Sequence, residues 1–102
     1  MQPWNCVLYA CMHKDDIVFR ALADPTRRLM LDEFSERKEQ TLYELTARLI
    51  MRHNVAISRQ ALARHIDVLE KAGLVSSEKR GKYRMLVFND EPLRAIVNRW
   101  LK

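Results

Sequence analysis

Residues 58–73 read SRQALARHIDVLEKAG, and this stretch predicts an amphipathic helix with a start signal and a stop signal. Ser58 is a favoured N-cap residue, and Gly73 is the residue type that most often ends a helix in the left-handed conformation. The apolar residues between them recur at spacings of three and four and form one stripe: Ala61, Leu62, Ile66 and Leu69. The remaining face is predicted to point to solvent: Arg59, Gln60, Ala63, Arg64, Asp67 and Lys71.

Two runs of β-forming residues follow this helix and predict a hairpin. They extend from Leu74 to Lys79 and from Tyr83 to Phe88, with Arg80-Gly81-Lys82 as the turn between them. The turn places positive charge at the tip of the hairpin. Asp90-Glu91-Pro92 then opens a last helix, whose apolar stripe is Leu93, Ile96, Val97, Trp100 and Leu101.

Two helices are predicted at the start of the folded region. Asp15 or Asp16 can cap the first helix. Asp24-Pro25 opens the second, which runs to about Ser35, because Asp is a good cap and Pro is tolerated at the first helical position. The apolar residues of the first helix are Ile17, Val18, Ala21 and Leu22.

A third helix is predicted after a polar break at residues 36–40. Thr41 opens it, and Glu44 three residues later completes a capping box. Residues 52–57 connect this helix to the helix at residue 58. The element order is therefore α-α-α-α-β-β-α, a mainly α fold with a β-hairpin wing, which is a winged helix-turn-helix. The predicted buried side of the third helix is Leu42, Leu45, Leu49 and Ile50.

The composition restricts the class of protein. The chain has 102 residues, of which 48% are hydrophobic and 30% charged, so it can bury one modest core. We read residues 15–102 as the domain and residues 1–14 as an N-terminal extension that we expect to be mobile. No apolar run reaches the ~18 residues of a membrane span and no signal peptide is evident, so we expect a cytoplasmic protein without membrane contact.

Catalytic chemistry is not indicated by the residue inventory. The two glycines exclude a glycine-rich phosphate loop. The histidines His13, His53 and His65 fall in separate segments, and no serine or cysteine has a base predicted beside it. We therefore expect no enzyme, no cofactor and no small-molecule substrate.

The positive charge is concentrated in one third of the chain. The formal net charge is +5, and residues 52–84 hold eight basic and three acidic side chains. Such a field suits a polyanion, because each phosphate that the protein neutralises releases counterions. The alternative, a basic face that is merely solvated, is not excluded by charge alone.

The predicted elements supply the rest of a DNA interface. A helix fits the major groove, where Arg pairs with guanine and Gln with adenine, and the basic wing suits a minor groove or the backbone. Ser58 and Thr41 sit at helix N-termini, which favour phosphate. His65 either donates a hydrogen bond to a DNA phosphate or packs between helices. The predicted DNA-binding residues are Thr41, Ser58, Arg59, Gln60, Ala63, Arg64, His65, Lys79, Arg80, Lys82 and Arg84.

Three stretches resemble the ArsR family of bacterial transcription repressors. They are LADPTRR at residues 22–28, SRQALARHI at 58–66 and VLEKAGLV at 68–75, and the resemblance extends over about residues 15–101. It implies a homodimer, built from the first and last helices, that binds a palindromic operator in double-stranded DNA. The interface residues that follow are Ile17, Val18, Ala21, Leu93, Ile96, Val97, Trp100 and Leu101.

The chain departs from metal-sensing members of that family. Thr41 and Tyr43 stand where those members carry a Cys-x-Cys pair, and neither is a ligand for a soft metal. The last helix has no histidine for the second type of family metal site. The connection before residue 58 is longer than in many members, so it either lengthens the third helix or adds a loop.

Two other interpretations stay open. Cys6, Cys11 and His13 are candidates for a metal or redox sensor, although they leave a zinc site one ligand short. Met12 resembles a natural start, so we also hypothesise that residues 1–11 are not made in the cell; the intact mass of the native protein tests this. The winged helix could instead dock an acidic protein, but the small Ala63 in the exposed set favours close approach to a DNA groove.

Overall fold

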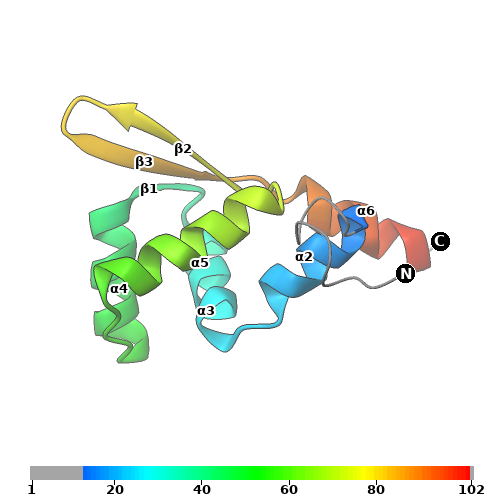
Figure 1. Ribbon diagram of the computed structural model, residues 1–102, viewed down its shortest axis with the longest axis horizontal. Coiled ribbons are helices and arrows are strands. Elements are labelled where there is room, and N and C mark those ends of the chain that lie inside the picture. Colours follow the sequence, from blue (N-terminus) through cyan, green and yellow to red (C-terminus); the bar gives the residue numbers. More distant parts are fainter. Residues whose placement is uncertain (1–12, 102) are drawn as a thin grey trace, which may run out of the picture.

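The computed structural model describes residues 13–101, and in that range it contains five helices and a three-stranded antiparallel sheet (Figure 1). This confirms the predicted winged helix-turn-helix with one added strand, β1. The helices are α2 (Lys14–Leu22), α3 (Pro25–Glu36), α4 (Leu42–His53), α5 (Arg59–Lys71) and α6 (Glu91–Trp100). The strands are β1 (Glu39–Thr41), β2 (Val75–Arg80) and β3 (Tyr83–Phe88).

The elements separate two ends of the molecule. Figure 1 shows α2 and α6 together at one end, the hairpin tip and α4 at the other, and α5 running between them. Direct contacts join α2 to α6 and α5 to β2. The basic wing and the apolar last helix therefore belong to different surfaces. None of the helices between residues 13 and 101 is long and apolar enough to cross a membrane.

Strand β1 is the main correction to the sequence prediction, which treated residues 36–40 as a polar break. The sheet order is β1-β3-β2, and Gln40 lies opposite Leu86 of β3. Gln40 is fully buried. Its amide nitrogen donates to the carbonyl oxygens of Glu33 (3.3 Å) and Arg37 (2.9 Å), and its oxygen accepts from Arg48 (2.7 Å). A polar residue can occupy the core here because these hydrogen bonds replace those with water.

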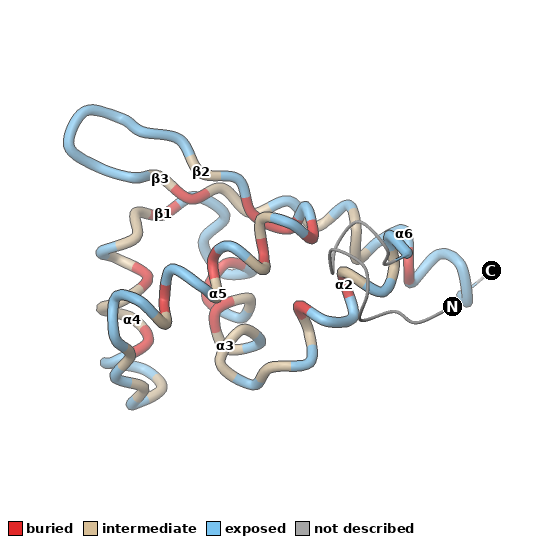
Figure 2. Tube along the Cα trace, in the orientation of Figure 1, coloured by how far each residue is buried: buried red, intermediate tan, exposed pale blue. Residues whose placement is uncertain are grey.

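The core lies where α5 meets α3, α4 and the sheet, and Figure 2 shows the buried segments converging there. The predicted stripe of α5 is buried at Leu62, Ile66 and Leu69. Phe34 of α3 stacks on Phe88 of β3, with ring centroids 5.9 Å apart. The other largest buried side chains are Met30, Leu45, Leu49, Leu74 and Leu86.

The sequence misplaced Ile50, because its side chain is 49% exposed on the outer face of α4. The α4 stripe is narrower than predicted: Leu45 and Leu49 are buried and Leu42 is half-buried. Leu45 and Leu49 are one turn apart and face α3 and the sheet. Ile50 lies one residue further round the helix, on a side that is turned about half to solvent.

The helix ends follow ordinary capping chemistry, with one shift from the prediction. His13, rather than Asp15 or Asp16, caps α2, because its Nδ1 accepts from the Asp15 amide at 3.1 Å. His13 and Lys14 therefore belong to the folded region and not to the extension. The capping box of Thr41 and Glu44 is confirmed.

The long connection before α5 proves to be both extra helix and loop. α4 continues to His53 and ends at Asn54, which adopts the left-handed conformation with φ 55°. Asn tolerates that conformation better than most residues. Ser58 then caps α5 by accepting from the Ala61 amide at 3.1 Å, and Gly73 ends it with φ 76°, as predicted.

Candidate nucleic-acid interface

The N-terminal half of α5 presents the polar face that the sequence predicts. Arg59, Gln60, Ala63 and Arg64 are all exposed. Neither Arg59 nor Arg64 forms an ion pair with any residue in the described range 13–101. Their guanidinium groups keep their donors for an outside acceptor, and an exposed Ala63 between them leaves room for close approach.

Ser58 and Thr41 lie at the N-termini of α5 and α4. Their hydroxyl oxygens accept from the amides of Ala61 (3.1 Å) and Glu44 (3.0 Å). Each hydroxyl still has its own hydrogen to donate, and the unpaired amides of a helix N-terminus favour an anion. The two caps can therefore receive phosphate without giving up their structural role.

His65 packs against α3 and is held by Arg27. The Arg27 Nη1 atom lies 3.0 Å from His65 Nδ1, and Arg27 Nε also donates to the Ala21 carbonyl at 2.8 Å. A guanidinium only donates, so Nδ1 must accept and the ring hydrogen is on Nε2. Burial lowers the pKa of His65, which agrees with a neutral ring. His65 therefore makes a helix-packing contact, and its partner is Arg27 of α3.

Two of the wing arginines are already paired within the protein. Arg80 donates to Glu39 of β1 at 3.2 Å and also to Glu78. Arg84 donates to Glu70 of α5 at 3.3 Å. Sequence reasoning missed Glu39 and Glu70 as partners, since β1 was not predicted and Glu70 lies fourteen residues before Arg84 in the chain.

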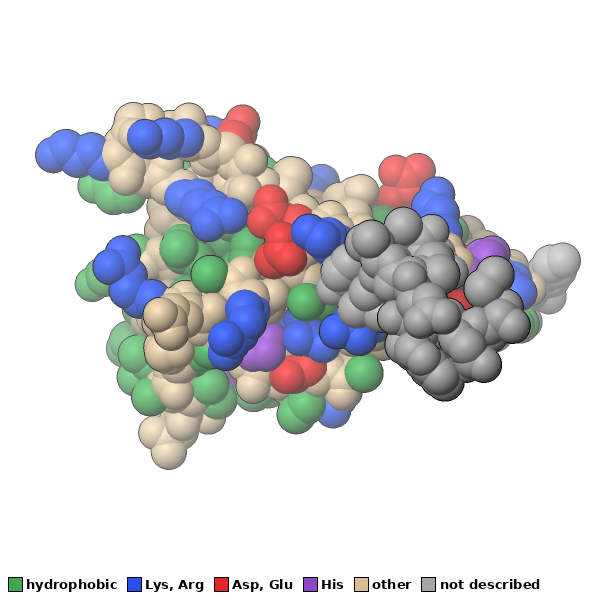
Figure 3. Space-filling view, viewed as in Figure 1, with side chains coloured by type: hydrophobic (Ala, Val, Ile, Leu, Met, Phe, Trp, Pro, Cys, Tyr) green, Lys and Arg blue, Asp and Glu red, His purple; other side chains and the backbone are tan. Residues whose placement is uncertain are grey.

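Lys79 and Lys82 of the wing differ from the two arginines. Both are exposed, and neither makes an ion pair with a residue between 13 and 101. Figure 3 shows Lys and Arg side chains around the wing and along the neighbouring helix, with hydrophobic atoms between them. The wing therefore offers two unpaired cations, Lys79 and Lys82. Arg80 and Arg84 must first release their carboxylate partners before they can bind an external anion.

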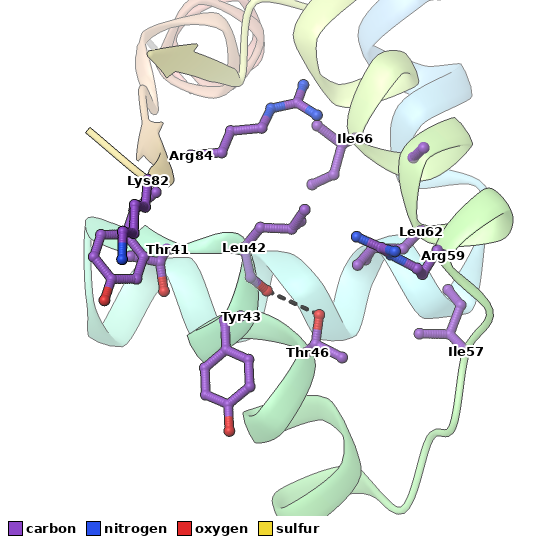
Figure 4. A pocket seen from close by; sticks show the side chains of 12 residues that line it. Thr41, Leu42, Tyr43, Thr46, Ile57, Arg59, Leu62, Ile66, Lys82 and Arg84 are labelled. Atoms are coloured by element: carbon purple, nitrogen blue, oxygen red, sulfur yellow. Dashed lines mark hydrogen bonds between the residues drawn. The ribbon is translucent and has the colours of Figure 1, made fainter. Parts of the chain in front are cut away.

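A groove of about 660 Å³ separates the wing from α5 and the start of α4. Figure 4 shows Lys82 and Arg84 on one side of it, Arg59, Leu62 and Ile66 on the other, and Leu42 between. The groove thus has an apolar floor and a cationic rim. Both walls belong to the predicted DNA-binding surface.

Arg27 and Arg28 are tied to the end of α2 rather than to a basic face. Arg27 donates to the carbonyls of Ala21 (2.8 Å) and Arg20 (3.0 Å), and Arg28 donates to that of Leu22 (2.7 Å). They satisfy carbonyl oxygens that a helix C-terminus leaves without partners.

The opposite end of the molecule carries an exposed aromatic patch. Phe19 of α2, which the sequence analysis did not select, stacks on Trp100 of α6 with ring centroids 6.1 Å apart. Phe19 is 40% and Trp100 61% exposed. Val97 and Leu101 extend this apolar surface.

Three residues of the predicted dimer interface are buried in the core of the protomer itself. Val18, Ala21 and Ile96 belong to its own core, and α2 packs against both α5 and α6. Their side chains are covered without a partner. Ile17 and Leu93 are half-buried against the same core.

Of the candidate sensor residues, only His13 lies in the range that the structure describes. Cys6 and Cys11 lie outside the described residues, and His13 is the cap of α2. No cluster of three metal-ligating side chains occurs between residues 13 and 101. Thr41 serves as a helix cap and Tyr43 is largely exposed, at the position of the absent Cys-x-Cys pair.

Comparison with known proteins places this geometry among DNA-binding regulators. A family model for a helix-turn-helix domain matches residues 22–78. The HTH-type transcriptional regulator YuzN of Bacillus subtilis (strain 168) is 58% identical over 87 residues, which cover 85% of this chain and 95% of YuzN. The transcriptional repressor SdpR of the same organism is 30% identical, with 82% of this chain and 84% of SdpR covered.

A solved structure agrees with these sequence relatives. The crystal structure of an ArsR family transcriptional regulator superposes with a TM-score of 0.71 and 31% identity, covering 86% of this chain and 82% of that chain. The superposed part of this chain is longer than the matched helix-turn-helix domain, residues 22–78.

Proposed function

Because this chain belongs to the ArsR family of winged helix-turn-helix transcriptional regulators, we propose that it is a homodimeric repressor acting on a palindromic operator. The family is not one of enzymes, and its members bind DNA through the helix-turn-helix. The proposal includes a cytoplasmic location, because the protein must reach chromosomal DNA.

The observation that carries the proposal is the unpaired face of α5. Arg59 and Arg64 keep their guanidinium groups free of ion pairs within residues 13–101, and Ala63 lies exposed between them. In the major groove, Arg59, Gln60 and Arg64 read base edges, while Ser58, Thr41 and the Nε2–H of His65 contact phosphate.

The wing completes the contact on the adjoining minor groove or backbone. Lys79 and Lys82 meet phosphate directly, because they have no carboxylate to release. Arg80 and Arg84 join after leaving Glu39, Glu78 and Glu70. This exchange costs little, because exposed ion pairs contribute weakly in water.

The aromatic end supplies the proposed dimer interface. Phe19, Val97, Trp100 and Leu101 expose large apolar side chains on one surface made by α2 and α6. A second copy would cover them around a two-fold axis, and the two α5 helices would then meet half-sites about 34 Å apart.

A salt titration of binding tests the proposal. Fluorescence anisotropy with a duplex from the protein's own promoter region should show tight binding that weakens steeply with salt, and a scrambled duplex should bind far less. Equal, weak binding to both duplexes would refute the repressor and would favour the protein-docking use of the fold.

Two variants separate the roles of α5 and the wing. Arg64→Ala should weaken binding to the promoter duplex by about 1–3 kcal/mol. It should also reduce the difference in affinity between the promoter duplex and the scrambled duplex. Arg80→Ala should weaken both duplexes alike and reduce the salt slope by about one. An unchanged salt slope in Arg80→Ala would remove the wing from the interface.

A further inference from the structure

The groove between α5 and the wing has an apolar floor, which is not a surface that double-stranded DNA needs for binding. Its floor is made by Leu62 and Ile66 of α5 and Leu42 of α4, with Ile57 at one side (Figure 4). Leu42 and Ile57 are half-buried and supply the accessible apolar surface of this floor, whereas Leu62 (4% exposed) and Ile66 (0%) lie behind it in the core. A sugar-phosphate backbone gains little from apolar floor of this kind, because its outer surface is charged and hydrated.

Three cationic side chains line the rim of the groove, and two of them form no ion pair with residues 13–101. Arg59 and Lys82 face it from opposite walls and form no ion pair with a residue between 13 and 101. Arg84 also lines it but is engaged with Glu70. The hydroxyl of Thr46 donates to the Leu42 carbonyl at 2.8 Å, so this side chain adds no free donor. The other polar groups of the lining are the hydroxyls of Thr41, Tyr43 and Tyr83, which can donate hydrogen bonds as the cations do. The polar side chains of the groove therefore suit a negatively charged group.

The dimensions suit a small molecule. The volume of about 660 Å³ falls within the range of about 300–1,000 Å³ that is usual for small-molecule sites. An apolar floor with convergent charged groups is also the usual composition of such sites. A ligand that satisfies both surfaces has an apolar body and one anionic group.

We propose that this groove binds a small amphiphilic organic anion, such as a medium-chain or aromatic carboxylate, and that the bound anion excludes DNA. The carboxylate pairs with Arg59 and Lys82, and the hydrocarbon body covers Leu42 and Ile57. The exclusion rests on the proposed function, in which Arg59 and Ala63, both lining the groove, face the operator. A ligand there withdraws Arg59 and fills the space above Ala63, so it acts as an inducer.

Octanoate is the probe for the test, with octanol and inorganic phosphate as matched comparisons. Amide spectra of the ¹⁵N-labelled full chain should show saturable shifts with octanoate at the start of α5 and in the hairpin. Octanol should bind about tenfold more weakly, because it lacks the charge. Phosphate should not reproduce the shifts, because it lacks the apolar body.

A pair of substitutions locates the site. Ala63→Leu fills the groove and should weaken octanoate binding about tenfold. Ala95→Leu makes the same change on exposed α6, at the other end of the molecule, and should leave octanoate binding unchanged. Circular dichroism of both variants checks that they fold.

The outcomes distinguish this inference from the proposed function. Octanol binding as tightly as octanoate, phosphate giving the same shifts, or Ala63→Leu having no effect would each overturn the ligand site. Octanoate that binds in the groove and releases the promoter duplex supports it. If octanoate binds as expected but no duplex is bound specifically, the proposed function fails and the ligand site stands.

Discussion

Replacing Gln40 with alanine should be among the most destabilising changes available to this chain. The Gln40 side chain is fully buried and takes part in three hydrogen bonds, with the Glu33 and Arg37 carbonyls and the Arg48 guanidinium. Alanine leaves these groups without their partner and opens a small cavity. Unsatisfied buried groups cost about 1–3 kcal/mol and the cavity adds to this, so we expect a loss of about 3 kcal/mol.

The measurements are urea unfolding, which gives the free energy of unfolding, and thermal unfolding, which gives the melting temperature, both followed by circular dichroism at fixed protein concentration. Because 1 kcal/mol moves the melting temperature of a domain of this size by about 4–8 °C, Gln40→Ala should lower it by more than 10 °C. Gln60→Ala is the matched control, since Gln60 is exposed on α5 and its loss should change stability by less than about 0.5 kcal/mol.

A second variant separates hydrogen bonding from packing. Gln40→Leu keeps most of the side-chain volume but removes the amide, so it should remain destabilising. If Gln40→Leu were as stable as the unmodified protein, the hydrogen bonds would not be what places this residue in the core. If the free energy of unfolding of Gln40→Ala lay within about 0.5 kcal/mol of that of the unmodified protein, the whole argument would be refuted.

Three further predictions follow from the surface and from His65. Glu39→Gln frees Arg80 from one carboxylate and should tighten DNA binding about twofold at low salt, measured by anisotropy; weaker binding would contradict it. Trp100→Asp places charge in the aromatic patch and should give a monomer by light scattering, whereas a persistent dimer would place the interface elsewhere. Burial lowers the pKa of His65, so the unfolded chain takes up the proton first and stability falls as the pH drops below the ordinary value of 6.5. His65→Gln should flatten this pH dependence of urea unfolding, and an unchanged slope would show that His65 is not its source.

Much of the helix-turn-helix could be predicted from local signals. The capping box at Thr41, the cap at Ser58 and the left-handed Gly73 act within one turn of the chain, so their chemistry is readable without the fold. The apolar stripe of α5 is equally local, because its spacing alone determines which side is buried.

The errors concern residues whose surroundings come from distant parts of the chain. Gln40 becomes a strand residue because β3 pairs with it 46 positions later, at Leu86. Ile50 is exposed because the described contacts of α4 with α3, β1 and β3 bury the side with Leu45 and Leu49. Val18 and Ala21, whose contact with a partner subunit stays a prediction, are buried in the protomer core because α2 packs against α5 and α6.

The candidate site likewise combines features that depend on local sequence with features that depend on distant contacts. The sequence by itself determined that α5 presents Arg59, Gln60 and Arg64 on one face, since helical periodicity needs no tertiary contact. Tertiary structure alone decided which cations are free, because Glu39 and Glu70 reach Arg80 and Arg84 only after β1 and α5 pack beside the hairpin. It also created the groove, whose walls come from three separate elements. Periodicity is a local property of the chain, whereas charge pairing and cavities depend on which distant segments meet.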